Sequence, residues 1–240
     1  MRYLLAPLLL LSSPALAAPV ASRTVSVGSF DRIRVEGPFE VRVTIGSPRA
    51  TIAGDPRIIE GVAVRIDGTT LSVRKGTGGW GEQPRSGAGA GPIVVTLSTP
   101  GLVSASVAAG GRLTIARMRG MKVDVTVGGN GSLALAAADT DQLNATLIGT
   151  GQMTLAGRAS RARLIASGPG AIDASGLGVN DLIVHLDGVG EVKAASRYTA
   201  EVTNSGLGTV TVAGNAKCRV DAAAGGPVVC GAPGPAGSAQ

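Results

Sequence analysis

His185 is the only histidine in the chain, so any hydrolysis that uses a histidine as general base would depend on it. Such chemistry needs a nucleophile within hydrogen-bond reach and a third group that orients the ring. No Gly-x-Ser-x-Gly segment, which presents the nucleophile in one large class of hydrolases, occurs in the sequence. Val184 and Leu186 flank the histidine and alternate with it, as on a strand with one buried face. We therefore predict a solvated surface histidine and no catalytic residue.

Paired carboxylates could also do chemistry, because glycoside hydrolysis uses two acids that flank the scissile bond. The acids expected at outward strand positions are Asp124, Asp139, Asp141, Asp173, Asp181, Asp187, Glu191 and Glu201. They do not recur at one position on adjacent sequence repeats, although Asp187 and Glu191 flank one corner. Aromatic platforms for sugar rings are scarce, at 2% of residues. We predict that the chain is not an enzyme and uses no cofactor; a polysaccharide-active enzyme stays the alternative.

No metal site is predicted from the sequence. Residues 128–133 resemble part of a calcium-binding nonapeptide repeat, but Ser132 stands where that repeat needs an aspartate. Zinc would need ligands beyond Cys218 and Cys230, and the single histidine cannot complete such a set. The two cysteines occupy inward positions of the last repeat, so we predict a disulfide that closes the final coil. Two buried free thiols are the alternative.

Arginines give the chain a formal net charge of +6, and this basicity suits an acidic partner. Arg158, Arg161 and Arg163 crowd one corner between two repeats and form the densest positive patch of the repeat region. We predict binding of a polyanion there, such as lipopolysaccharide or an acidic envelope polysaccharide. Nucleic acid is excluded, because no basic cluster is interleaved with aromatic residues for base stacking. A solvated basic surface without a ligand is the alternative.

The candidate side chains above lie in a short sequence repeat, and each copy of the repeat contains a glycine at the same position. The glycines are Gly111, Gly131, Gly151, Gly170, Gly190, Gly208 and Gly226, at spacings of 20, 20, 19, 20, 18 and 18 residues. From eight residues before each glycine to four residues after it, every second position is apolar or glycine, with Asn204 as the one polar exception. Strict alternation predicts strands with one buried face, and a fixed period predicts stacked coils.

We predict an all-β fold, a β-solenoid with coils of about 18–20 residues and Gly-x-Gly corners. The glycines should point inward where two walls of strands converge. Stacked antiparallel hairpins or a β-sandwich are the alternative, because short glycine-rich connections also suit hairpins. Near-constant repeat length, with similar residues in register, favours the solenoid.

The rest of the chain divides by composition. Residues 1–17 have the charged start, apolar segment and Ala15-Leu16-Ala17 site of a secretory signal peptide cleaved after Ala17. We predict a linker over residues 18–26, irregular β coils over 27–100 with a glycine-rich loop over 76–91, regular coils over 101–230 and a disordered tail over 231–240. No transmembrane segment is predicted, and we expect export to the periplasm or the surface of a bacterium.

The segment Phe30-Asp31-Arg32-Ile33-Arg34-Val35-Glu36-Gly37 is similar to the opening F-x-x-I-x-V-x-G of a bacterial family, the putative auto-transporter adhesin head GIN domain. The step Asp55-Pro56, the strand Leu71-Ser72-Val73 and the later Gly-x-Gly repeats also resemble that family. The resemblance covers roughly residues 27–212. It implies an exported β-helix-like domain with an adhesion role and supplies no catalytic residues. We therefore expect a structural or binding protein of the cell envelope, with an accessory that binds a protein partner as a further alternative.

Overall fold

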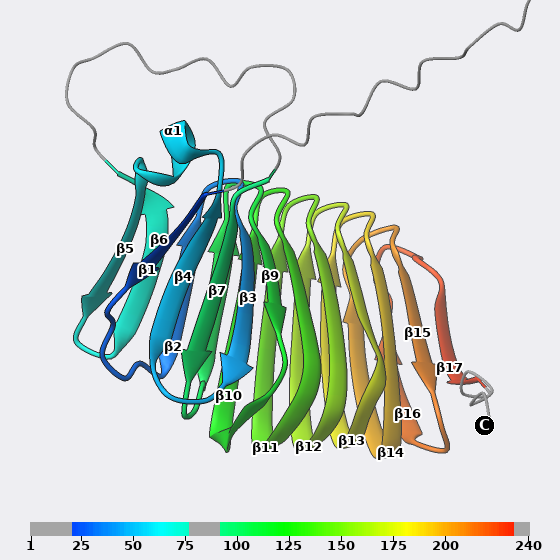
Figure 1. Ribbon diagram of the computed structural model, residues 1–240. Helices are drawn as coiled ribbons and strands as arrows, with labels where there is room; N and C mark the ends of the chain where they lie inside the picture. The colour runs from blue at the N-terminus through cyan, green and yellow to red at the C-terminus, as the bar shows by residue number, and fades with distance from the viewer. Residues whose placement is uncertain (1–20, 77–91, 233–240) are drawn as a thin grey trace, which may run out of the picture.

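The chain forms a single stack of β coils that is almost entirely strand (Figure 1). The computed structural model describes residues 21–76 and 92–232. The predicted signal peptide and cleavage site, nearly all of the glycine-rich loop and all but the first two residues of the predicted tail lie outside the described residues.

The regular part of the stack is built from parallel strands that wrap around the core. Its elements are β8 (Ser104–Ala108), β9 (Arg112–Ile115), β10 (Met118–Gly128), β11 (Ser132–Ile148), β12 (Gln152–Ser167), β13 (Ala171–Asp187), β14 (Glu191–Asn204), β15 (Thr209–Ala213), β16 (Lys217–Asp221) and β17 (Val228–Ala232). Leu133 pairs with Met153, Met153 with Ile172 and Ile172 with Val192, always in parallel register. The prediction of a β-solenoid is confirmed, and the hairpin alternative is wrong for this region.

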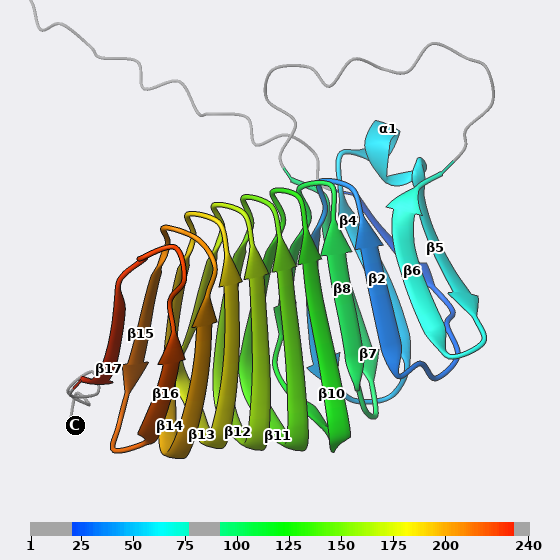
Figure 2. The same ribbon diagram turned by 180° about the vertical axis from the view of Figure 1, so that it is seen from behind.

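Each coil has two walls and two corners. Wall A consists of β8, the second halves of the long strands and β16. Wall B consists of β9, the first halves of the long strands, β15 and β17 (Figures 1 and 2). The glycine corner follows wall A. The loose corner lies inside the long strands, where wall B turns into wall A.

The N-terminal third continues both walls, but not in chain order. Its elements are β1 (Ala21–Val25), β2 (Arg32–Glu36), β3 (Glu40–Ile45), β4 (Arg49–Gly54), α1 (Pro56–Ile59), β5 (Val62–Asp67), β6 (Thr70–Lys75) and β7 (Val94–Thr99). Strand β2 lies between β6 and β8 in wall A, and β3 lies between β7 and β9 in wall B, all parallel. The first coil of the chain is therefore inserted between later ones.

The outermost strands at this end run antiparallel, unlike the coils. Strand β4 pairs with β7 and β1 with β4, and β5 pairs with β6 in a hairpin that turns at Gly68. Strands β5 and β6 follow each other through a short turn, which an antiparallel pair allows and a parallel pair does not. Strand β1 falls within the stretch predicted to be a linker, so those residues are an integral strand.

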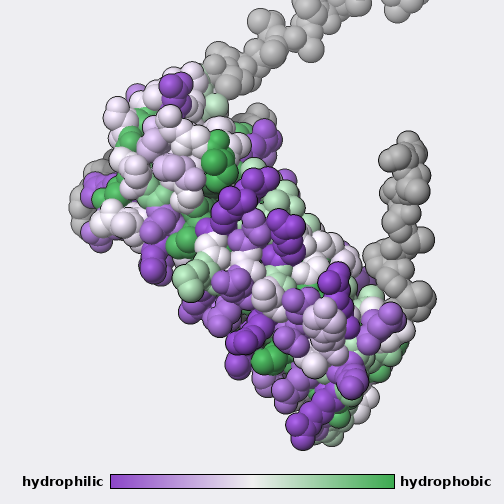
Figure 3. Space-filling model, turned by 90° about the horizontal axis from the view of Figure 1, so that it is seen from below, coloured by the Kyte–Doolittle hydropathy of each residue, from purple (hydrophilic) through white to green (hydrophobic). Residues whose placement is uncertain are grey.

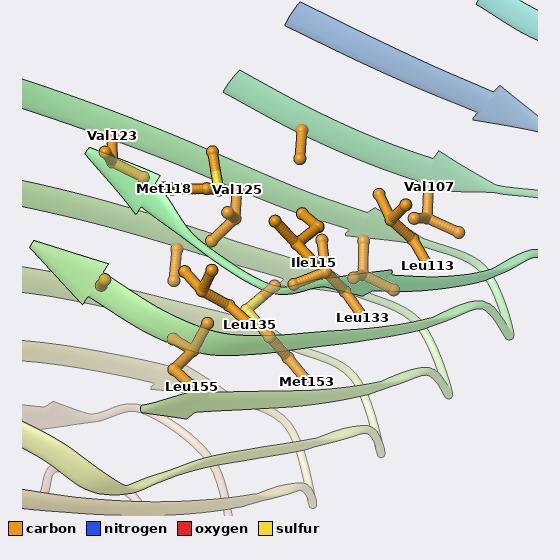
Figure 4. Packing of buried hydrophobic residues seen from close by; sticks show 14 of the residues in the cluster. Val107, Leu113, Ile115, Met118, Val123, Val125, Leu133, Leu135, Met153 and Leu155 are labelled. Atoms are coloured by element: carbon orange, nitrogen blue, oxygen red, sulfur yellow. The ribbon is translucent and has the colours of Figure 1, made fainter. Parts of the chain in front are cut away.

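The core is a column of Val, Leu, Ile and Ala side chains between the two walls (Figure 4). Leu113, Leu133 and Met153 occupy one position on successive coils and are at most 2% exposed. Asn204, the polar exception, is fully buried and is satisfied locally. Its Nδ2 donates to the carbonyl of Gly208 at 2.8 Å, and its Oδ1 accepts from the N–H of Gly206 at 3.2 Å.

The predicted inward orientation of the corner glycines is confirmed. A side chain is excluded there by the backbone of the preceding coil, which is a more specific reason than the predicted convergence of two walls. A Cβ at Gly151 would lie 2.5 Å from the carbonyl oxygen of Gly131, the equivalent glycine one coil earlier, and 2.8 Å from Val127 Cγ1. A Cβ at Gly170 would lie 2.6 Å from the oxygen of Gly151. Positive φ is instead adopted two residues earlier, as at Gly149 with φ 113°. Two glycines per corner thus meet two separate requirements.

Candidate binding groove

A groove of about 910 Å³ runs along the loose corner and crosses successive coils. It is bounded by three rows of residues, each row taking about one residue per coil. The floor row is Gly120, Thr140, Ala159, Val179, Ser196 and Gly214; one rim is Arg119, Asp139, Arg158, Gly178 and Ala195; the other rim is Met121, Asp141, Ser160, Asn180, Arg197 and Asn215. Figure 3 views the molecule from this side, where hydrophilic side chains are interspersed with less polar ones. We call this feature the corner groove.

The local sequence explains the groove. The floor residues are small, and those at the middle coils are buried, so the chain dips toward the core between two outward rows. The register shifts on entering the corner, between Leu135 and Ala138 and again between Thr154 and Ala156. Gly157 has φ 116°, and a Cβ there would collide with the backbone of Ala138. Bulges of this kind redirect side chains.

One rim carries a cluster of three charges. Arg119 Nη2 lies 3.0 Å from Asp139 Oδ2, and Arg158 Nε lies 3.3 Å from Asp139 Oδ1. The hydrogen bond from the Arg158 guanidinium is the main cause that holds the pKa of Asp139 below its ordinary value. Desolvation opposes it, and the charge of Arg158 together with the hydrogen bond and charge of Arg119 adds to the lowering. Two cations share one anion, so the cluster keeps a net positive charge.

The other rim begins with the exposed Met121, and its remaining side chains are polar and mostly without ion pairs. Asp141 and Arg197 form no ion pair in the described structure, and the guanidinium of Arg197 lies 6.0 Å from the ring centroid of Tyr198. Ser160 is exposed, and Asn180 is half-buried. These side chains offer hydroxyl, amide, carboxylate and guanidinium groups at successive coils, which suits hydrogen bonding to a polar ligand.

The three predicted polyanion-binding arginines are exposed but do not form a single cluster. Arg158 stands on the groove rim beside Asp139, whereas Arg161 and Arg163 point outward from wall A on the same strand. Arg161 is in register with Gln142 and Asp181, and Arg163 with Asn144 and Ile183. Neither forms an ion pair within the described residues. Two of the three cations are therefore free, and the third is shared with an acid.

His185 is half-buried on β13, between the buried Val184 and Leu186. Its neighbours in register are Ile165 and Thr203, so no acid orients it from an adjacent coil. The structure places it outward on a strand, as predicted.

Most of the candidate acids make local contacts instead of facing one another. Asp173 accepts hydrogen bonds from the N–H and Oγ of Ser175, which lower its pKa. Glu191 lies 2.9 Å from Lys193 Nζ and raises the pKa of that amine. Asp124 accepts from Asn144 and Asp181 from Thr199. Among the described residues, no group of three His, Cys, Asp or Glu side chains could hold a metal ion.

Cys218 and Cys230 are at disulfide distance, with Cα atoms 6.5 Å apart. They are in register with the buried Ala200 and Val212 of the preceding coil. Cys218 is nevertheless exposed, as is its neighbour Val220, because no described coil covers this end of the stack. The side chains of Cys218 and Cys230 take the inward direction that the repeat gives to their equivalents. Cys218 is exposed because it lies in the last described coil of the stack.

The groove itself was not predicted from the sequence. Its signal was present as a run of small residues at one position of successive coils, Gly120, Thr140, Ala159 and Ser196 among them. The bulges shift that position by one residue at Ala159 and by three at Ser196, so it does not align when residues are counted from the glycines.

Comparisons with known proteins agree with this architecture. A family model described as "Putative auto-transporter adhesin, head GIN domain" matches residues 29–216. Crystal structures of putative adhesins are similar: one from Bacteroides fragilis has a TM-score of 0.77 at 18% identity and covers 90% of this chain and 98% of that chain. One from Parabacteroides merdae has 0.64 at 16%, covering 88% and 96%.

A putative lipid binding protein from Parabacteroides distasonis has a TM-score of 0.64 at 14% identity, covering 89% of this chain and 95% of that chain. At these identities the likeness shows the fold alone. No curated protein matches the chain. Within the described part of the chain, no helix has the length and hydropathy needed to cross a membrane.

Proposed function

Because the chain belongs to the head GIN domain family of putative auto-transporter adhesins, we propose that it is an exported, non-catalytic binding protein of a bacterial envelope. Its ligand is an acidic envelope polysaccharide or lipopolysaccharide, held by arginines at and beside the loose corner. Secretion follows from the signal-peptide pattern of residues 1–17.

The observation that carries this proposal is the unpaired positive charge beside the corner groove. Arg161 and Arg163 project from wall A without an acidic partner, and Arg119 and Arg158 share a single carboxylate on the adjoining rim. Guanidinium groups pair with carboxylates and phosphates in a bidentate geometry. Exposed cations also attract polyanions over distances of about 10 Å at 0.1 M salt.

The arrangement of the acids supports binding without catalysis. Glycoside hydrolysis needs two carboxyl groups about 5–10 Å apart across a sugar, one of them with a raised pKa. Among the described residues, the two acids with shifted pKa values, Asp139 and Asp173, are both shifted downward. A carboxyl group with a lowered pKa is a poor proton donor near neutral pH.

The test measures binding of the mature protein to polymannuronate, to lipopolysaccharide and to a neutral dextran control. We expect binding to the two anionic polymers that falls steeply with salt, and loss of most of it in the R158S/R161S/R163S variant. The variant R49S/R65S/R74S removes the same charge from exposed arginines elsewhere and should bind as the wild type does. Equal binding by both triple variants, or salt-insensitive binding, contradicts the proposal. Turnover of either polymer contradicts the non-catalytic assignment.

A further inference from the structure

We propose that the corner groove binds an extended glycan chain laid along the stack axis, with about one sugar unit to each coil. This inference rests on the proposed polysaccharide binding and adds where the chain lies and in which direction. The arginines of wall A attract the polymer, and the groove holds its backbone.

The dimensions of the groove suit one extended chain. Its rows take residues from six successive coils, which at about 4.8 Å per coil gives a length of roughly 24 Å. A volume of about 910 Å³ over that length corresponds to a cross-section of about 38 Å². An α-helix with its side chains is about 10–12 Å across, so most of it would lie outside a groove of this cross-section. A globular ligand would contact only part of the length of the groove.

The backbone around the groove also argues against a peptide strand as the occupant. Strand addition needs an unpaired edge, but β12 is paired with β11 on one side and β13 on the other throughout the corner region. An extended peptide in the groove would leave its own N–H and C=O groups without backbone partners. A glycan has no such requirement, because its hydroxyl groups bond to side chains and water.

The rim side chains recur at a spacing that suits a polymer of sugars. Asp141, Ser160, Asn180, Arg197 and Asn215 place one polar group at each of five coils along one rim, after the exposed Met121 at the first coil. The repeat of about 4.8 Å is close to the advance of one β-linked sugar in an extended chain. Asp141 is free to accept from hydroxyl groups, and Arg197 is free to bind an acidic substituent.

The opposite rim is open toward its C-terminal end, because Gly178 and Ala195 replace the charged side chains found at the first three coils. This opening offers a clean way to block the groove. A Cβ at Gly178 would lie 3.7 Å from its nearest neighbour, the oxygen of Gly157, in ordinary contact. Gly178→Phe therefore fills the groove without a clash at the backbone. Gly128, at the other corner, has its nearest neighbour at 3.8 Å, so Gly128→Phe is the matched control.

The test uses linear oligomannuronates, from the dimer to the octamer, titrated into the mature protein by calorimetry. We expect affinity to rise with each added sugar up to about five or six units, the number of coils crossed, and then to level off. Gly178→Phe should weaken hexamer binding by on the order of tenfold or more, and Gly128→Phe should not. Both variants should melt as the wild type does, which excludes misfolding as the cause.

Three outcomes overturn the inference. One is an affinity that no longer rises beyond the dimer. Another is hexamer binding that Gly178→Phe leaves unchanged but R161S/R163S abolishes, which places the ligand on wall A and leaves the proposed function standing. The third is polymer binding without any oligomer binding. If the polymannuronate and lipopolysaccharide assays are both negative, the proposed function fails together with this inference.

Discussion

Substituting Gly151 by valine tests how the coils are spaced. A Cβ at this position would lie 2.5 Å from the oxygen of Gly131, about 0.9 Å short of the 3.4 Å at which ordinary contact begins. The same oxygen accepts the N–H of Gln152 at 3.0 Å, so moving it away weakens a hydrogen bond between coils. Overpacking costs about 1–3 kcal/mol and a hydrogen bond about 0.5–1.5 kcal/mol. We expect Gly151→Val to lower the free energy of unfolding by about 2–4 kcal/mol.

The matched control is Gln152→Val, one residue along the chain. Gln152 is exposed and points away from the core, and valine suits a strand, so this change should stay within about 0.5 kcal/mol. Urea unfolding followed by circular dichroism gives both values. At roughly 2–4 °C per kcal/mol for a chain of this size, Gly151→Val should also melt several degrees lower. If the two variants unfold alike, the corner glycines do not point at the preceding coil.

Three further outcomes follow from other parts of the structure. Replacing Cys218 and Cys230 by alanine should cost about 2–3 kcal/mol, and hydrogen exchange should show the last coil opening before the others; uniform loosening would contradict a local role for the bridge. NMR titration should place the pKa of Asp139 below 3.8, and Arg158→Gln should raise it. A carboxyl group with a lowered pKa stabilises the folded state at any pH above the pKa it has in the unfolded chain. This stabilisation is lost as the pH falls through the pKa of the folded state. Asn204→Leu, although apolar like its equivalents in other coils, should destabilise by about 1–3 kcal/mol because it leaves two backbone groups of the corner unpaired; a more stable variant would show that those groups find other partners.

The regular coils could be predicted from the sequence because each residue's direction follows from its distance to a glycine. Leu133 and Met153 alternate with outward residues and lie 20 positions apart, as their register requires. The N-terminal arrangement could not be predicted, because the residues of β2 and β3 do not indicate which later strands will pair with them. Strand β2 pairs with β6 and β8, and β3 pairs with β7 and β9. Only long-range pairing decides which of several similar strands become neighbours.

The candidate site was partly predictable for a related reason. The sequence showed that Arg158 is exposed near a corner, but not that it shares Asp139 with Arg119. Asp139 and Arg158 are 19 residues apart, whereas Arg119 and Asp139 are 20 apart, because a bulge removes one residue from the register. When residues are counted from the corner glycines, Asp139 and Arg158 therefore fall at positions that differ by one residue, although they are neighbours in register. The groove depends on the same bulges and was missed with them.

The contact between successive corner glycines also bears on how such a chain can change its length. Each of these glycines excludes a side chain because of the carbonyl of the coil before it, and its own carbonyl does the same for the coil after it. A duplication or deletion of one complete coil preserves this relation at every junction, and coils of 18 to 20 residues all keep it because the difference in length is absorbed at the loose corner. The stack can thus gain or lose whole modules during evolution, and the surface along the loose corner would lengthen or shorten by the same step.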